Sequence, residues 1–423
     1  MSRTVAFILA GGVGTRLSLL TRFRAKPAVP FAGRYRIIDF TLTNCVRSDI
    51  DRIYLLTQYR SPSIVRHVGI GKPWDLDRVE GGIRSLNPHL GFQAADWYQG
   101  TADAIYQNIS VLREMDCRNV LILSGDHIYR MDYRLFEEFH ERAGTPASLS
   151  VVGVPKSLCK EFGIATIDAK GAIRKFEEKP LSTKSNLASM GIYIFRKDFL
   201  ISTLERLKRS TTDLDFGKHV MPYLVGRKKI SAYRYKGFWL DIGTLKSYYS
   251  ASLALLAKRP RMNLYGEMTP VLTVPDDNPP LFVAQSANVD RSLICNGCVI
   301  RGEVSSSILS PGVTVERGAR VENSVIFHGS HVGREAMLKN VILDEGVSIG
   351  KKASIGEGDP RVANALQPDY LDFGLTVIGG KTVVPSGMRV GTNCLVCGSR
   401  ESGRIPNRDV EDGGYLLADD IQL

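Results

Sequence analysis

The 423-residue chain is longer than the size at which one hydrophobic core keeps growing, so its length predicts at least two domains. Apolar residues make up 43% of the chain and charged residues 23%, proportions that exclude a largely disordered protein. The formal net charge of +11 predicts attraction to polyanions. Because lysine and arginine are scattered along the chain, this charge favours phosphorylated small molecules over nucleic acid as partners.

The apolar run near the start of the chain, residues 5–10, is too short to span a membrane. It also lacks the basic leader and the cleavage site of a signal peptide. We therefore expect a cytoplasmic protein that makes no membrane contact.

Seven cysteines include two pairs at CxxC spacing, Cys295 with Cys298 and Cys394 with Cys397. A zinc site would need four thiolates to converge from turns about a hundred residues apart. Cysteine is also common as a small buried side chain, and the sequence favours this interpretation.

Short β-branched runs alternate with helical patterns up to about residue 249, as in a parallel sheet flanked by helices. This alternation predicts a doubly wound, mostly parallel α/β domain. The predicted strands cover residues 5–10, 53–57, 120–124, 148–154 and 190–195, and the predicted helices cover 101–114 and 133–142.

A last helix is expected at residues 245–258, before a proline-rich passage at 260–280 that cannot continue a helix. The predicted organisation is a catalytic domain (1–258), a linker (259–285), a β-helix domain (286–400) and a C-terminal tail (401–423). The last twenty residues are polar, which is typical of a loose tail.

Beyond the linker, apolar residues recur every six positions, as at Val315, Val321 and Phe327. The same spacing relates two further sets: Ile326, Val332 and Leu338, then Leu343, Ile349 and Ile355. One flat face per hexad and three faces per coil is the geometry of a parallel β-helix. The alternative, a β-sandwich, has period two within strands and no sustained period of six. Residues 357–373 break the repeat, and residues 377–396 resume it.

The sequence LAGGVGTRL at residues 9–17 is a glycine-rich turn between the first strand and a helix. Glycines allow a positive φ and let several backbone N–H groups face one anion. The turn lacks both the Gly-Lys-Ser/Thr ending of a P-loop and the GxGxxG spacing of a dinucleotide site. Three nearby cations, Arg16, Arg24 and Lys26, could neutralise a triphosphate, or could form a solvated basic face.

This turn, followed by RAKPA at 24–28 and RIIDF at 36–40, strongly resembles the ADP-glucose pyrophosphorylases of bacteria and plants. The resemblance implies a Rossmann-like nucleotidyltransferase domain, a left-handed parallel β-helix and a homotetramer. Further motifs of the family follow in order: WYQGTADA (97–104), SGDHIY (124–129), FEEKP (176–180), SMGIY (189–193), DFGK (215–218) and WLDIGT (239–244).

Asp126 lies just past the end of a predicted strand, where open α/β sheets bind ligands. The family implies that Asp126 and Asp241 together hold Mg²⁺, a hard cation that prefers oxygen ligands. On its own, Asp126 would be interpreted as a helix N-cap. His127 has no second histidine at ligand spacing and is interpreted as supporting rather than ligating.

The resemblance assigns Lys179 to the phosphate of glucose 1-phosphate and Glu178 to the sugar hydroxyls, a division that suits an ammonium and a carboxylate. It implies catalytic roles for Arg16, Lys26, Asp126, Lys179 and Asp241. The implied substrate-binding residues are Gly11, Gly12, Gly14, Thr15, Gln58, Tyr98, Gly100, Thr101, Gly163, Glu178, Lys179, Ser189 and Tyr193.

The implied activity is glucose-1-phosphate adenylyltransferase, in which ATP and glucose 1-phosphate give ADP-glucose and pyrophosphate for glycogen or starch synthesis. Residues 81–90 match the family's usual nucleobase loop poorly, so a relative using another triphosphate is an alternative. A non-catalytic regulatory subunit is a second alternative, and an acyltransferase in the β-helix, with His328 or His331 as base, is a third.

The family also implies control by anionic metabolites. Phe23 occupies a place where some bacterial relatives carry a lysine linked to activation, so the identity of the effector does not carry over. Four arginines form the candidate effector site: Arg22, Arg24, Arg34 and Arg36. The alternative is that they are surface arginines that only solvate the protein.

Overall fold

A computed structural model describes residues 4–12, 14–88, 97–265 and 270–420. The chain forms two compact units, each built from two stretches of sequence. The first unit contains Met1–Gly12 and Ile38–Trp239, and the second contains Val13–Ile37 and Leu240–Leu423. These units differ from the domain boundaries expected from the sequence, because residues 13–37 belong with the C-terminal half of the chain.

The first unit is organised around a sheet in which β1 (Thr4–Leu9) lies between β4 (Arg52–Leu56) and β6 (Asn119–Ser124), parallel to both. β11 (Leu187–Arg196) continues the sheet antiparallel to β6. The sheet is therefore mixed: β5, β4, β1 and β6 are parallel to one another, and β12 also pairs in parallel with β8. The other strands of this sheet are β5 (Gly82–Leu86), β8 (Ala147–Gly153), β9 (Gly163–Ile167), β10 (Ile173–Glu178) and β12 (Ile230–Arg234).

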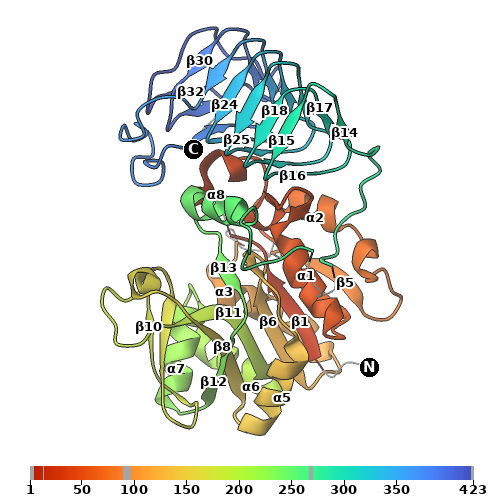
Figure 1. Cartoon of the computed structure of the whole chain (residues 1–423). Coiled ribbons are helices and arrows are strands. Elements are labelled where there is room, and N and C mark those ends of the chain that lie inside the picture. The colour runs from red at the N-terminus through yellow and green to blue at the C-terminus, as the bar shows by residue number, and fades with distance from the viewer. Residues whose placement is uncertain (1–3, 13, 89–96, 266–269, 421–423) are drawn as a thin grey trace. The chain divides into compact units, whose positions relative to one another are not determined.

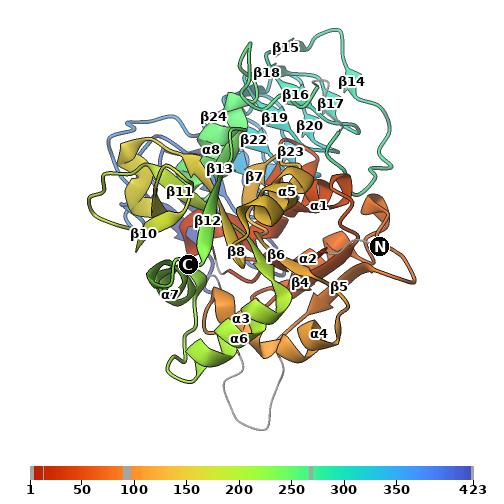
Figure 2. The same cartoon turned by 90° about the horizontal axis from the view of Figure 1, so that it is seen from below.

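Helices cover both faces of this sheet (Figure 2). One face packs against α3, α4 and α6, and Val5 and Phe7 of β1 share a buried cluster with residues of these helices. The helix expected over 101–114 is interrupted at Asn108, where α3 ends and α4 begins. The helices of the first unit are α1 (Ile37–Arg47), α2 (Ser61–Val68), α3 (Thr101–Gln107), α4 (Ile109–Glu114), α5 (Tyr133–Ala143), α6 (Lys197–Lys208) and α7 (Met221–Gly226). Its short 3₁₀ and π helices are η3 (Lys72–Trp74), η4 (Lys156–Glu161) and η5 (Phe216–Val220).

The C-terminal part of the second unit is a parallel β-helix with three sheets (Figure 1). Successive partners such as Thr314, His331 and Ser348 are 17 residues apart, one short of three hexads. All nine apolar residues that define the six-residue repeat are buried, which confirms the prediction.

The first sheet contains β14 (Phe282–Val283), β17 (Val299–Ile300), β20 (Thr314–Val315), β23 (His331–Val332), β26 (Ser348–Ile349) and β29 (Val383–Val384). The second contains β15 (Asn288–Asp290), β18 (Glu303–Ser305), β21 (Arg320–Glu322), β24 (Met337–Lys339), β27 (Ser354–Ile355) and β30 (Arg389–Val390). The third contains β16 (Leu293–Ile294), β19 (Ile308–Leu309), β22 (Val325–Ile326), β25 (Val341–Leu343), β28 (Thr376–Ile378), β31 (Leu395–Cys397) and β32 (Tyr415–Leu417).

The end of the chain differs from the expected loose tail, because β32 pairs in parallel with β31 and extends the third sheet. The interruption at 357–373 falls as predicted between β27 and β28. Its fixed point is the buried Asn364, whose side-chain amide donates to the carbonyls of Asn393 and Gly413. The inserted loop is thus tied to the last coils.

The second unit also holds the segment 14–37 and the helix that follows the first unit. The elements here are η1 (Thr15–Thr21), η2 (Lys26–Ala28), β2 (Pro30–Phe31), β3 (Tyr35–Arg36) and α8 (Leu245–Ala254). Two further short strands are β7 (His127–Tyr129), which belongs to the first unit, and β13 (Trp239–Asp241), which begins at the last residue of the first unit. Among the residues that the structure describes, no helix is long and apolar enough to cross a membrane.

Neighbouring valines of β29 test how the β-helix core contributes to stability. Val384 is 1% exposed and Val383 is 41% exposed. Val384→Ala deletes two buried methyl groups and should cost about 2 kcal/mol, lowering the thermal midpoint of the β-helix by about 4–8 °C. Val383→Ala is the matched control and should change the midpoint little. Equal shifts in differential scanning calorimetry would contradict the assigned core face.

Candidate functional site

The carboxyl ends of three parallel strands bring Gly11, Gln58 and Asp126 to one edge of the first unit's sheet. In register, Leu9 of β1 lies beside the last residues of both β4 and β6. A Cβ on Gly11 would lie 3.1 Å from the Gln58 Cβ, so glycine is what allows this approach. A Cβ on Gly12 would meet no described atom within 4 Å. This edge is where open α/β sheets bind ligands.

Asp126 is half-buried and held by its neighbours. The Ser124 hydroxyl donates to its carboxylate, and His127 Nε2 lies 3.5 Å from Asp126 Oδ1. His127 in turn packs edge-on against Trp239, with 5.1 Å between ring centroids. His127 is thus close enough to orient the carboxylate, and its supporting rather than ligating role stays a prediction.

A β-bulge in β11 lies beside Ser124, close to Asp126. The pairing of β11 with β8 shifts register between Ser189 and Tyr193, and Gly191 within this stretch has φ +65°. A Cβ on Gly191 would contact Ser124. Bulges of this kind commonly re-aim strands next to functional sites.

The start of α3 is fixed by several contacts. Gln58 Oε1 accepts a hydrogen bond from the Tyr98 backbone N–H at 2.7 Å. A Cβ on Gly100 would lie 2.4 Å from the Leu214 carbonyl oxygen, so only glycine fits there. The Thr101 hydroxyl donates to Asp215 Oδ2 at 2.8 Å. The segment 98–101 is therefore locked to the loop before η5.

Glu178 lies in a cradle made by two glycines. A Cβ on Gly163 would be 2.8 Å from Glu178 Oε2, and a Cβ on Gly217 would be 2.4 Å from it. Burial and the neighbouring Asp215 charge raise the pKa of Glu178. Glu178 as a whole residue is exposed, and a carboxylate in such a cradle is suited to accept hydrogen bonds from hydroxyl groups.

Lys179 follows directly, with φ +47°, and its backbone N–H donates to the Phe162 carbonyl at 3.0 Å. The positive φ, unfavourable for lysine, is held by that hydrogen bond. The Lys179 side chain is exposed, as a residue that meets a solvated phosphate can be.

Tyr193 is buried and stacks on Phe216 with 5.0 Å between ring centroids. Burial raises the pKa of Tyr193, so its hydroxyl stays protonated and can donate. The Tyr98 hydroxyl donates to the Leu86 carbonyl at 3.4 Å and accepts from the Asn108 side chain at 3.0 Å. As a predicted sugar contact, Tyr98 would therefore offer its ring or its backbone more readily than its hydroxyl.

The second unit contains the remaining predicted catalytic residues, which are Arg16, Lys26 and Asp241. Lys26 Nζ lies 3.0 Å from Asp241 Oδ1, and both side chains are mostly buried. A Cβ on Gly243 would be 3.1 Å from both Arg16 Nη2 and Asp241 Oδ2. Arg16, Lys26 and Asp241 therefore form one charged group, and the interpretation of a solvated basic face is wrong for the buried Lys26.

Gly14 adjoins this charged group. It has φ +69°, and a Cβ there would be 3.0 Å from the Lys26 Cβ and 3.2 Å from Thr21. The Thr21 hydroxyl donates to the Gly14 carbonyl at 2.9 Å. Gly14 thus combines a left-handed turn with a close approach, immediately before Thr15 begins η1.

The four arginines of the candidate effector site have different surroundings. Arg24 is ion-paired with Asp344, and Arg36 with Glu345. An anion would have to compete with these carboxylates. Arg22 donates to the Asp420 carbonyl at 3.2 Å, and Arg34 is exposed.

Both CxxC pairs lie in or beside the β-helix. Cys298, Cys394 and Cys397 are buried, and burial raises the pKa of Cys397 to about 11 and those of Cys295 and Cys394 to about 12. Thiols with such pKa values remain protonated near neutral pH, as is typical of small buried cysteine side chains.

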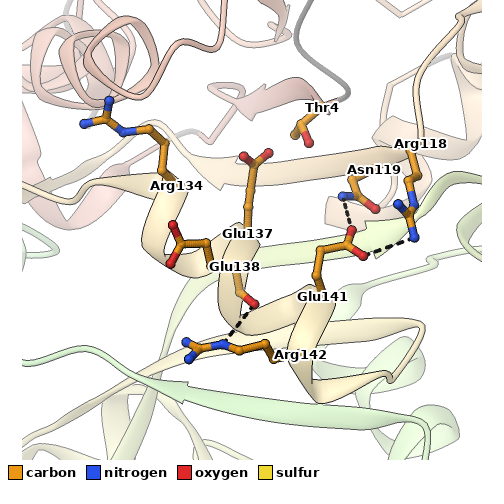
Figure 3. Close-up of a pocket in the computed structure, with 8 residues that line it drawn as sticks. All are labelled: Thr4, Arg118, Asn119, Arg134, Glu137, Glu138, Glu141 and Arg142. Carbon is orange, nitrogen blue, oxygen red and sulfur yellow. Dashed lines mark hydrogen bonds and ion pairs between the residues drawn. The ribbon is translucent and has the colours of Figure 1, made fainter.

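A cavity of about 680 Å³ opens at the opposite end of the first unit's sheet, beside the start of β1 and β6 (Figure 3). None of its eight lining residues is a predicted site residue. Arg118 and Glu141 pair across it at 3.1 Å. The predicted residues Gly11, Gln58 and Asp126 lie instead at the carboxyl ends of the parallel strands.

Sequence reasoning gave no role to Asp215, although the DFGK motif was recognised. Its Oδ1 accepts the backbone N–H groups of Gly217 and Lys218, and its Oδ2 accepts the Thr101 hydroxyl. Ser124 was also missed. An aspartate followed two residues later by glycine is the signal that could have pointed to Asp215.

Comparisons with known proteins agree with both units. The model of the nucleotidyl transferase family matches residues 5–258, and a GlmU-like C-terminal hexapeptide model matches 279–367. The second match agrees with the expected left-handed β-helix. Proteins named glucose-1-phosphate adenylyltransferase from Thermotoga neapolitana and Thermotoga maritima are each 46% identical to this chain over 99% of both chains. One from Acetivibrio thermocellus is 39% identical over 98% of this chain and 97% of its own.

The charge of Asp215 should control the ionisation of Glu178. Asp215→Asn removes a neighbouring negative charge, so the pKa of Glu178 should fall toward its ordinary value. Asp213→Asn, at an exposed position on the same loop, is the control. The measurement is a pH titration by ¹³C NMR of labelled glutamate, with Glu178→Gln identifying the signal. An unchanged Glu178 titration in the Asp215 variant would contradict the described cradle.

Proposed function

The chain belongs to the glucose-1-phosphate adenylyltransferase family of nucleotidyl transferases, and from that premise we propose that it joins ATP and glucose 1-phosphate into ADP-glucose with release of pyrophosphate. One structural observation supports this proposal independently of the similarity to the named relatives. The buried Lys26 and the half-buried Arg16 and Asp241 form one charged group beside the glycine turn, which provides the cations needed to hold a triphosphate.

In the proposed reaction, a phosphate oxygen of glucose 1-phosphate attacks the α-phosphorus of ATP in line with the leaving pyrophosphate. The nucleophile is already anionic, so no general base is required. Catalysis then consists of aligning two anions and offsetting their repulsion. Arg16 and Lys26 would neutralise the triphosphate, and Lys179 would bind the sugar phosphate.

The sugar would be oriented by the first unit. Glu178, in its glycine cradle, is placed to accept hydrogen bonds from sugar hydroxyls, and the protonated Tyr193 can donate one. Ser189, Gly163 and Thr101 come from the strands and helix that surround Glu178 and Asp215. These contacts would set the reacting phosphate in position.

Nucleotidyl transferases typically use a divalent metal ion, and we propose Mg²⁺, held by Asp126 and Asp241. The donor set fits, because carboxylate oxygens are the ligands that Mg²⁺ prefers. The half-buried Asp126, oriented by Ser124 and His127, is suited to that role. When bound, the ion would offset charge on the triphosphate and on the departing pyrophosphate.

Preference for adenine is proposed from the likeness to the named relatives. Residues 82–86 form β5, the last strand at the parallel edge of the sheet, and residues 89–90 of the poorly matching loop lie outside the described residues. A regulatory subunit without turnover is the less favoured alternative, because Arg16, Lys26, Asp126 and Asp241 are all present.

We further propose a cytoplasmic homotetramer that supplies glycogen or starch synthesis and responds to anionic metabolites. Arg22 is the arginine best suited to such an effector. It donates to the carbonyl of Asp420, and Asp420 lines a second cavity of about 680 Å³ together with Arg400, Arg404 and Arg408 and with the acidic Glu401 and Asp419.

An assay of pyrophosphate release tests the activity. The purified protein would be supplied with ATP, UTP, dTTP or GTP, each combined with several sugar 1-phosphates, with and without candidate metabolites. We expect the highest kcat/KM for ATP with glucose 1-phosphate. A clear preference for another triphosphate would replace the adenylyl assignment, and a homomer that releases no pyrophosphate would favour the regulatory role.

Asp126→Asn and Asp241→Asn should each lower turnover by roughly 100-fold or more, since each removes a negative charge from the proposed metal site. The fold should persist by far-UV circular dichroism in both variants. The thermal midpoint should stay close to the original in Asp126→Asn and should fall in Asp241→Asn, because the mostly buried Lys26 loses the charge of its partner Asp241. Asp277→Asn, at an exposed linker position, serves as control. Near-normal turnover in either variant would remove that residue from the metal site.

A further inference from the structure

The second unit contains a buried ion pair that the proposed reaction does not use. Arg24 Nη1 lies 2.8 Å from Asp344 Oδ1, and the two side chains are 9% and 1% exposed. Arg24 Nη2 also lies 3.2 Å from Glu345 Oε2. A charge this deeply buried is stable only beside an opposite charge. The ion pair therefore holds the segment that contains Arg24 against the turn that contains Asp344.

Asp344 is carried by the β-helix. It follows β25 at a turn, where its Oδ1 accepts the Glu345 backbone N–H at 2.7 Å. The Ser330 hydroxyl, one coil earlier, donates to the Asp344 carbonyl at 2.9 Å. The carboxylate is therefore part of a rigid frame of parallel strands.

Arg24 is carried by the segment that holds the proposed triphosphate cations. Its guanidinium donates to the Leu20 carbonyl at 3.2 Å, which ties it to the last turn of η1. Lys26 follows two residues later, and Lys26 and Thr21 both pack on Gly14. A displacement of Arg24 would therefore also displace Lys26 and the first turn of η1, which contains Arg16.

Further contacts fasten the same segment within the second unit. Arg36 pairs with Glu345 at 3.1 Å, and the Tyr248 hydroxyl of α8 donates to the Pro30 carbonyl at 2.6 Å. A Cβ on Gly33 would lie 2.6 Å from Cys295 Sγ, so only glycine allows the chain to approach the β-helix there. Residues 24–36 are therefore held at several points, with the Arg24–Asp344 pair the most buried.

We propose that Asp344 is a positioning residue for catalysis: through Arg24, the β-helix holds the segment that carries Arg16 and Lys26 in the geometry required by the triphosphate. The β-helix then contributes directly to nucleotide use. The kinetic part of this inference rests on the proposed function, whereas the structural part does not.

Hydrogen exchange tests the structural part without any activity. In Asp344→Asn, Arg24 loses the more buried of its two carboxylate partners and keeps only Glu345, so the amides that close the turns of the segment should exchange at least about 10-fold faster. The informative amides are those of Leu17, Arg22, Ala28 and Val29, whose hydrogen bonds lie within the segment. Glu316→Gln is the matched control, since Glu316 is also a β-helix turn carboxylate paired with an arginine, Arg301. It should leave these amides unchanged.

Steady-state kinetics test the catalytic part. Asp344→Asn should lower kcat by about 10- to 100-fold and raise the KM for ATP, because small displacements of positioning groups have effects of this size. The KM for glucose 1-phosphate should stay within about twofold, since the proposed sugar contacts lie in the first unit. General destabilisation would instead reduce the active fraction and leave both KM values unchanged.

The outcomes are separable. Unchanged exchange and unchanged kinetics in a folded Asp344→Asn protein would overturn the inference while leaving the proposed function intact. Failure of the unmodified protein to release pyrophosphate would overturn the proposed function, with hydrogen exchange still testing the structural part. If Asp344→Asn does not fold, Glu345→Gln at the partly exposed margin should give the same shifts at smaller size. Their absence there would count against the inference.

Discussion

Burial of positive charge is the constraint that organises the site of this strongly basic protein. A lysine or arginine that must meet a phosphate away from bulk water needs a carboxylate beside it in the folded chain. Lys26 has Asp241 at 3.0 Å, 215 residues away in sequence, and Arg24 has Asp344 at 2.8 Å. These pairs explain why residues 13–37 form a compact unit with the C-terminal half of the chain rather than with the sheet that precedes them.

The sugar side of the site is governed by close backbone approach. Glu178 fits only because positions 163 and 217 have no side chain, and segment 98–101 reaches the loop at Leu214 only through Gly100. Asp215 joins these parts by accepting hydrogen bonds from both sides. At Gly100, Gly163 and Gly217, glycine is needed because a side chain would clash with a neighbour. At Gly14, glycine also allows the left-handed backbone conformation.

The sequence predicted those features that depend on neighbours in the chain. Apolar runs gave β1, β4, β6 and β8 within a residue or so at each end, and the hexad spacing gave the β-helix core. The interruption at 357–373 was equally visible. The strand in the expected tail was missed because polar residues surround Tyr415, Leu416 and Leu417, and only the edge offered by β31 makes them a strand.

Features that depend on distant partners could not be predicted. Arg24 and Arg36 were interpreted as an open anion site, since nothing in their local sequence indicates Asp344 or Glu345. The antiparallel addition of β11 to β6 was likewise hidden, because a buried strand has the same composition in either direction. Asp215 was recognised as part of a motif, but its connection of Thr101 to the loop before η5 was not predicted, since that role depends on Thr101 and Glu178 lying nearby in space.

The geometry of the β-helix explains why its contribution comes from a turn. Inward positions of each hexad are filled by core residues such as Leu343 and Ile349, and these leave no room for charge. Carboxylates therefore lie at outward strand positions, such as Glu322 of β21, or at turns, and Asp344 is a turn carboxylate held by neighbouring hydrogen bonds. His328 and Glu345 stand 17 residues apart, at the same corner of successive coils, and the Gly346 backbone N–H donates to the His328 carbonyl there. Charged residues at a turn, here Asp344 and Glu345, can therefore hold residues 24–36 in place without any change in the β-helix core.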